Sequence, residues 1–196
     1  LLLRHGITTV ADVRSQPRSR WCPLFSREKL EPALRERNIS YVFLGLELGA
    51  RSDDPSCYKE GRVSYAALAQ TGAFQTGLQR AVEGSKKHRL ALMCAEKEPL
   101  ECHRTILVAR HLEAQGLFVM HIHGEGALET HADAMERLSQ RLKLPEQDMF
   151  LSPADRLAEI YRIQGEKIAY VKTSIPCLVA FLTAGVKFAS MIAGEA

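Results

Sequence analysis

The alternation of short apolar runs with amphipathic segments most strongly constrains this chain. Short runs flanked by turn residues predict buried strands at 7–13, 39–44, 89–93 and 117–123. Helical spacing of apolar residues predicts helices at 25–37, 64–82, 102–115, 131–142 and 152–171. Strands that alternate with helices favour a parallel sheet with right-handed crossovers. We therefore predict an α/β fold, with a small, mostly parallel sheet flanked by helices.

The composition indicates one globular domain. The chain has 196 residues, of which 46% are hydrophobic and 25% charged. A chain of this length and composition can form a hydrophobic core that is stable without disulfide bonds. A net charge of +3 permits an anionic partner without requiring one. The five cysteines are scattered with no CxxC pair, which is typical of free thiols in a reducing compartment. We expect a cytoplasmic protein.

The two ends of the chain differ from the rest. The opening Leu1–Gly6 is typical of the end of a helix whose beginning is missing, so we expect an N-terminally truncated domain at 1–172. Residues 173–196 form an apolar tail of unclear role. Pro176 and Lys187 argue against a membrane span there. The alternatives are a helix packed on the core, a partner-binding segment, or sequence foreign to the fold.

The stretch 90–104 predicts a functional site, because a strand, a polar loop and a helix follow one another there. Strand ends and helix N-termini are common ligand sites in open α/β sheets. Either thiol is a candidate nucleophile or ligand, and the carboxylate and imidazole are candidates to move protons. The candidate catalytic residues are Cys94, Glu96, Cys102 and His103.

A second polar loop follows the strand 7–13. Arginines and serine hydroxyls in one loop favour an anion cradle, and Asp12 can orient an arginine. The candidate anion-binding residues are Arg14, Ser15, Arg18, Ser19, Arg20 and, from the other loop, Arg104. A solvated basic loop with Asp12 capping the turn is the alternative. We expect both loops to be neighbours on one rim of the sheet, with His121 supporting the site or buried as a core histidine.

A metal centre is an open alternative. Cys94, Cys102 and His103, with His121 or His123, have suitable donor atoms, but their spacing is not that of a zinc ribbon or finger. Adjacent Cys and His side chains point apart on a helix, so we expect that both do not reach one ion. We therefore assign no metal ligand and leave the cofactor open.

Several motifs together resemble the family known as domain of unknown function 488 (DUF488). They are Asp12-Val-Arg14-Ser15-x-Pro17-x-Ser19-Arg20, Ile39-Ser-Tyr41 with Leu48-Gly49, Cys94-Ala-Glu96-x-x-Pro99-x-x-Cys102-His103-Arg104, His121-Ile122, and the segment 161–170. The resemblance covers 1–172 and implies a small α/β domain with a Cys/Arg/His site, without an established reaction or cofactor. Family members usually begin with a further strand that carries a Gly-His-Ser-like turn, which this chain lacks, and they usually end near Tyr170.

Three functional hypotheses follow from these residues. The first is an enzyme that acts on an anionic substrate, either phosphorylated or derived from nucleic acid. The second is a non-catalytic module that binds nucleic acid or a phosphorylated ligand through the arginines. The third is a metal-binding protein that uses the cysteines and histidines. The sequence predicts neither the substrate nor the oligomeric state.

Overall fold

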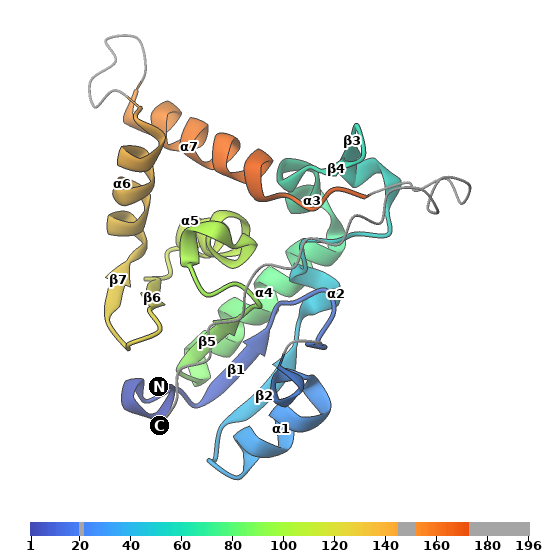
Figure 1. Cartoon of the computed structure of the whole chain (residues 1–196), viewed down its shortest axis with the longest axis vertical. Helices are drawn as coiled ribbons and strands as arrows, with labels where there is room; N and C mark the ends of the chain where they lie inside the picture. Colours follow the sequence, from blue (N-terminus) through green and yellow to red (C-terminus); the bar gives the residue numbers. More distant parts are fainter. Residues whose placement is uncertain (20–21, 145–151, 173–196) are drawn as a thin grey trace, which may run out of the picture.

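A three-stranded parallel sheet lies at the centre of the protein (Figure 1). The computed structural model describes residues 1–19, 22–144 and 152–172. The sheet has the order β2-β1-β5, and its strands are β1 (Thr9–Asp12), β2 (Ser40–Phe43) and β5 (Leu90–Met93). Every residue of β1 is buried, as the central strand of a parallel sheet requires. The predicted α/β class with a mostly parallel sheet is confirmed.

Helices connect and cover these strands. The α-helices are α1 (Arg27–Arg35), α2 (Gly45–Leu48), α3 (Tyr65–Gln70), α4 (Gly72–Lys87), α5 (Arg110–Ala114), α6 (His131–Leu142) and α7 (Pro153–Ile168). The 3-10 helices are η1 (Leu3–His5), η2 (Pro23–Phe25), η3 (Pro55–Cys57) and η4 (Pro99–Glu101), and a π-helix, η5 (Arg104–Ala109), runs into α5.

Side-chain caps set several helix boundaries. The predicted helix 64–82 is divided at Thr71, whose extended backbone ends α3 and whose hydroxyl accepts the Phe74 N–H to begin α4. Ser152 caps α7 in the same way through the N–H of Asp155, as the sequence predicted. Gly6 adopts φ 63° at the end of η1, a conformation that glycine reaches without strain.

Two segments differ from the sequence prediction. Residues 52–62, for which the sequence predicts neither helix nor strand, contain η3 and a hairpin of β3 (Tyr58–Lys59) and β4 (Arg62–Val63). Most of this segment is exposed, but Cys57 is fully buried and packs in the core. The run 117–123 forms β6 (Met120–Ile122), which pairs antiparallel with β7 (Leu128–Thr130) and, within the described residues, does not join the parallel sheet.

Apolar packing on both faces fixes the sheet. Leu78, Leu107 and Val108, from α4 and η5, belong to one buried cluster with Ala11 and Val13. A second cluster joins β1 to Leu34 of α1 and to Ile39. A third cluster lies around Leu100 and Ile106 and includes residues of α6 and α7. Helices therefore hold both faces of the sheet. The carboxyl ends of β1 and β5 lie together at one edge because these two strands are parallel neighbours.

The membrane prediction concerns the far end of the chain. Among the described residues, no helix combines the length and apolar character needed to cross a bilayer. The apolar tail expected at 173–196 lies outside the described residues.

Candidate functional site

The two polar loops leave the sheet side by side, as predicted. Strands β1 and β5 are parallel neighbours, and Asp12 lies opposite Met93 in the register. The pairing continues past the strands, because the Val13 N–H donates to the Met93 carbonyl at 3.0 Å. The loop that follows β1 and carries Arg14 and Arg18, here called the arginine loop, therefore starts next to the loop that follows β5 and carries Cys94 and Glu96, here called the thiol loop.

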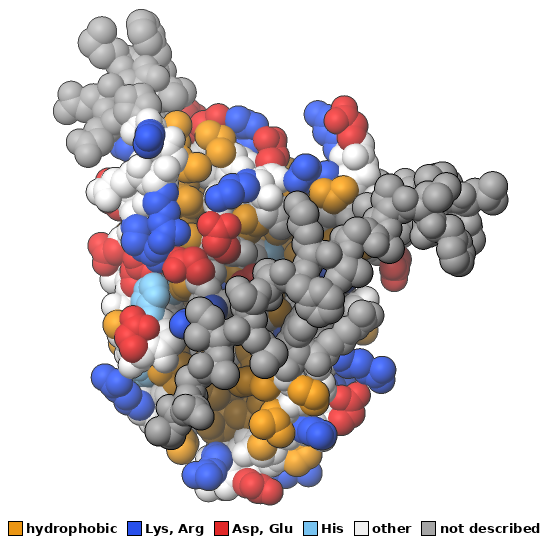
Figure 2. Space-filling view, viewed as in Figure 1, with side chains coloured by type: hydrophobic (Ala, Val, Ile, Leu, Met, Phe, Trp, Pro, Cys, Tyr) orange, Lys and Arg blue, Asp and Glu red, His pale blue; other side chains and the backbone are white. Residues whose placement is uncertain are grey.

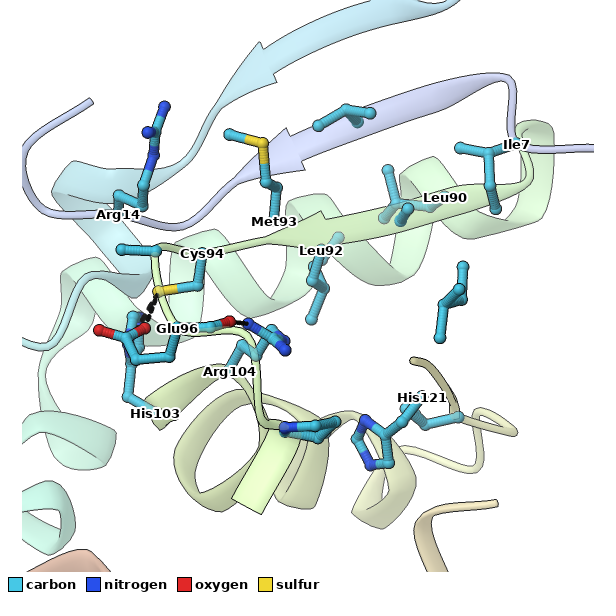
Figure 3. A pocket seen from close by; sticks show the side chains of 18 of the residues that line it. Ile7, Arg14, Leu90, Leu92, Met93, Cys94, Glu96, His103, Arg104 and His121 are labelled. Carbon is cyan, nitrogen blue, oxygen red and sulfur yellow. Dashed lines mark hydrogen bonds between the residues drawn. The ribbon is translucent and has the colours of Figure 1, made fainter. Parts of the chain in front are cut away.

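Four candidate residues of the thiol loop form one compact cluster. One donor atom from each of Cys94, Glu96, Cys102 and His103 lies within 4.8 Å of all the others. The two thiols donate to the same carboxylate oxygen, Glu96 Oε2, at 2.9 Å from Cys94 and 3.1 Å from Cys102. Figure 3 shows Cys94 and Glu96 pointing toward one another beside Arg104. We call these four residues the Cys/His/Glu cluster.

The expectation that Cys102 and His103 point apart is wrong. It assumed that both residues lie on one regular helix. Instead Cys102 ends η4 with an extended backbone (φ −132°, ψ 138°), and His103 begins the next helix, η5, in the helical region (φ −62°, ψ −25°). This break in the backbone between two helices lets adjacent side chains reach the same point.

The orientation of His103 is fixed by the end of β1. Its Nε2 lies 3.1 Å from the Val13 carbonyl oxygen, which can only accept a hydrogen bond. Nε2 therefore carries a proton and donates, so in the neutral ring Nδ1 has a free lone pair. This Nδ1 faces the Cys94 sulfur at 3.5 Å, and the ring is almost wholly buried. Metal-binding histidines are oriented in the same way by a backbone carbonyl.

The electrostatics of the cluster favour a protonated Cys94 beside an ionised Glu96 carboxylate. The neighbouring Cys102 side chain, and then burial, raise the pKa of Cys94 above its ordinary value. Burial raises the pKa of Glu96, but the hydrogen bonds from the two thiols outweigh it, and the net pKa is lowered. Cys94 is therefore not an activated thiolate in the absence of a nearby cation.

Arg104 supports the thiol loop through its backbone. Its guanidinium donates to the carbonyl oxygens of Glu96, at 2.7 Å, and Lys97, at 3.3 Å. Its main-chain N–H and its Nη1 also point at the Cys102 sulfur, at 3.4 and 3.5 Å. Arg104 therefore fixes the loop backbone and the Cys102 sulfur relative to one another.

In the arginine loop, Arg14 is engaged by protein groups. Its guanidinium makes a bidentate ion pair with the fully buried Asp12, at 2.8 and 2.6 Å, and donates to the Phe25 carbonyl at 2.9 Å. The Tyr41 hydroxyl donates to the same carboxylate at 2.7 Å. Figure 3 shows the Arg14 guanidinium directed away from Cys94. Asp12 thus orients an arginine, one of the two roles considered for it.

The other residues of the arginine loop differ in exposure. Ser15 Oγ accepts the Arg51 N–H at 3.0 Å, and Ser19 Oγ accepts the Cys22 N–H at 3.0 Å. Arg18 is largely exposed and approaches Glu28 at 3.6 Å. Arg20 lies outside the described residues.

His121 belongs to a buried polar chain apart from the Cys/His/Glu cluster. Its Nε2 lies 2.9 Å from His131 Nδ1, and His131 Nε2 lies 2.6 Å from the Tyr161 hydroxyl. Figure 3 places His121 well away from Cys94. The other two members of the chain, His131 and Tyr161, come from α6 and α7. Their positions in the sequence do not indicate that they meet a residue of β6. Sequence reasoning therefore missed this chain, as it missed Tyr41 as a partner of Asp12.

A hollow connects these features on one face of the protein. It is lined by the apolar residues of β5, by part of the Cys/His/Glu cluster, by Arg104 and by His121. Figure 2 shows hydrophobic side chains gathered in a hollow on this face. Among the described residues, the cluster therefore borders a cavity large enough for a small molecule.

Comparison with known proteins identifies the family. The model of a family described as domain of unknown function DUF488 matches residues 1–111. The chain belongs to the DUF488 family. The match includes both polar loops and the whole Cys/His/Glu cluster, while the expected extension of the DUF488 domain to residue 172 stays a prediction. No curated protein and no solved structure matches the chain.

Proposed function

We propose that this DUF488 protein binds a divalent transition-metal ion, with Zn²⁺ as the best fit, at the Cys/His/Glu cluster. The observation that carries the proposal is the convergence of four donor atoms of three chemical types within 4.8 Å of one another. Ligands of one tetrahedral zinc ion lie about 3–4 Å apart, since the metal–ligand distances are roughly 2.0–2.3 Å. Small side-chain adjustments are therefore enough to close the site.

The donor set favours zinc over the hard cations. Two sulfurs and an imidazole nitrogen suit Zn²⁺, whereas Mg²⁺ and Ca²⁺ prefer oxygen ligands. The free Nδ1 of His103, held toward the sulfurs by the Val13 carbonyl, supports the same choice.

Binding of a metal ion should change the protonation of the cluster. A bound cation reverses the local preference, because it favours the thiolate over the thiol. Both thiols then lose their protons, and the N–H groups of Arg104 are in position to stabilise the Cys102 sulfur. Metal binding should accordingly release protons and weaken as the pH falls.

Metal analysis of purified protein tests the proposal. We expect about one zinc per chain in protein purified without chelator, and loss of that zinc in Cys102→Ser. Cys22→Ser is the matched control, since Cys22 is a half-buried free thiol outside the cluster. Wild-type protein that neither retains nor takes up zinc in a competition titration against a chromogenic chelator would refute the proposal.

A second candidate is a cysteine-dependent enzyme acting on an anionic substrate. It is favoured by the 3.5 Å contact between Cys94 Sγ and His103 Nδ1, the arrangement of a thiol beside a general base. In this proposal Arg104 and the arginine loop bind the anion. Alkylation separates the candidates. Faster reaction of Cys94 than of Cys22 with iodoacetamide in metal-free protein favours the enzyme, whereas slow reaction that Zn²⁺ abolishes favours the metal site.

Two further hypotheses stay proposals. A non-catalytic module for nucleic acid or phosphorylated ligands needs the arginines but not the thiols, so its binding should weaken with salt and survive Cys94→Ser. A cytoplasmic location is supported by the four described cysteines, none of which forms a disulfide within the described residues.

A further inference from the structure

The four donors of the Cys/His/Glu cluster are unequal in their surroundings. Cys102 and His103 are buried at 1% and 7% exposure, and Cys94 is half-buried. Glu96 is exposed, on the loop that follows β5, and lines the hollow. An ion held by the two sulfurs and the imidazole therefore has its remaining side toward the cavity, where the carboxylate lies.

The hydrogen bonds of Glu96 change when the thiols lose their protons. In the ion-free cluster Oε2 accepts from both thiols, and no other side chain among the described residues donates to this carboxylate. Thiolates cannot donate, and their negative charge repels the carboxylate. The side chain then has two options, which are to ligate the ion or to remain beside it as a proton acceptor.

Exposure and anchoring favour the second option. The backbone carbonyls of Glu96 and Lys97 are held by Arg104, so the loop stays in place while the exposed carboxylate is free to rotate. Catalytic zinc sites have three protein ligands and an open fourth position, whereas structural sites are closed by four. Two cysteines and one histidine with a non-ligating glutamate are the donor set of the zinc deaminases, where the glutamate moves the proton.

We propose that Cys94, Cys102 and His103 are the permanent ligands and that Glu96 is a catalytic general base, with a water molecule at the fourth position. This rests on the metal site proposed above and extends it to hydrolysis at an sp² carbon. When bound, the ion would polarise a water molecule for attack. Glu96 would accept one proton of that water while the water oxygen bonds to the sp² carbon and the π-electron pair moves onto the adjoining heteroatom. When that pair returns, the bond to the leaving group would break, the leaving group would depart with the electrons of that bond, and Glu96 would give it the proton.

Cobalt substitution with azide as an exogenous ligand tests this assignment. The full chain is loaded with Co²⁺, and its visible spectrum is recorded during an azide titration. We expect thiolate-to-cobalt charge-transfer bands and a saturable change of the d–d bands, because azide replaces the water. Glu96→Gln should bind Co²⁺ within about tenfold of wild type, keep the thiolate bands and still respond to azide.

A matched control and distinct failures complete the design. Glu101→Gln removes an exposed carboxylate from the adjoining η4, one that faces Lys167 rather than the cluster, and should behave as wild type. A wild-type spectrum insensitive to azide, with a response gained only in Glu96→Gln, would show that Glu96 fills the fourth position. A loss of Co²⁺ affinity in Glu96→Gln well beyond about a hundredfold would also overturn the assignment. If the wild-type protein does not bind one Co²⁺ per chain, the proposed metal site itself is refuted.

Discussion

Asp12 is fully buried, and its carboxylate accepts hydrogen bonds from Arg14 and Tyr41. A buried carboxylate is tolerated here because the Arg14 guanidinium lies within hydrogen-bond distance and faces both carboxylate oxygens. The pair therefore fixes the start of the arginine loop beside the Cys/His/Glu cluster.

The Asp12→Asn variant should be strongly destabilised. It leaves the buried Arg14 guanidinium without its counter-charge, and breaking a buried pair typically costs about 3–5 kcal/mol. The free energy of unfolding in urea measures the effect. Glu28→Gln, which weakens only the exposed contact with Arg18, should change it by less than about 0.5 kcal/mol. Equal effects of the two substitutions would contradict this reading of Asp12.

At the scale of elements, a polar chain joins β6, α6 and α7. His121, His131 and Tyr161 come one from each element, and their hydrogen bonds run through the buried interior. Each hydrogen bond in this series of three side chains joins two buried polar atoms. Removal of one side chain therefore leaves a buried polar group without a partner.

Tyr161→Phe removes the hydroxyl that bonds His131 Nε2 while keeping the ring. We expect a loss of about 1–3 kcal/mol in the free energy of unfolding, the usual cost of an unsatisfied buried group. Thermal and urea unfolding both measure it. Unchanged stability would mean that His131 finds another partner in the variant.

The same chain should make the fold sensitive to acid. Burial lowers the pKa of His121 and of His131 to about 4, from an ordinary value of 6.5, and for His121 the neighbouring His131 and Arg104 add to the effect. The unfolded chain binds these protons first, so stability is complete above pH 6.5 and falls as the pH is lowered toward 4. Each imidazole contributes about 1.4 kcal/mol per pH unit in that window.

Urea unfolding at pH 7, 6, 5 and 4 measures this slope. His121→Gln removes one titrating group, so its slope should be shallower than that of wild type, although the variant is less stable at pH 7. Identical slopes in the two proteins would assign the acid sensitivity to other residues.

For the whole molecule, the proposed metal site would link residue Cys94, which follows β5, to Cys102 and His103, which lie between η4 and η5. Zinc that binds only the folded state should raise stability by at most about 2.7 kcal/mol at a hundred times its dissociation constant. We expect a higher unfolding temperature with zinc than with chelator, and no such difference in Cys102→Ser. A zinc effect of equal size in the variant would indicate binding elsewhere.

The sequence was sufficient for the α/β fold and for the meeting of the two loops. Both follow from strand periodicity and from the parallel pairing of neighbouring strands, which brings Val13 and Met93 to one edge. Helix 131–142 was also correct, because Thr130 caps its start.

The geometry of the Cys/His/Glu cluster could not be predicted from the sequence. It depends on the extended backbone of Cys102 between two helices, and a regular helix was the reasonable expectation from the spacing. The position of Pro99, which begins a separate short helix, was the available signal. The engagement of Arg14 depends on the burial of Asp12 and on Tyr41 from another strand, which no local pattern reveals.

The three proposed ligands, Cys94, Cys102 and His103, lie within a span of ten residues of the chain. A denatured chain can therefore wrap the same short segment around a cation with little loop-closure entropy. Such capture by the denatured ensemble lessens the equilibrium benefit of the ion. It also means that a chelated loop can form before the sheet assembles, so zinc should accelerate refolding more than it slows unfolding.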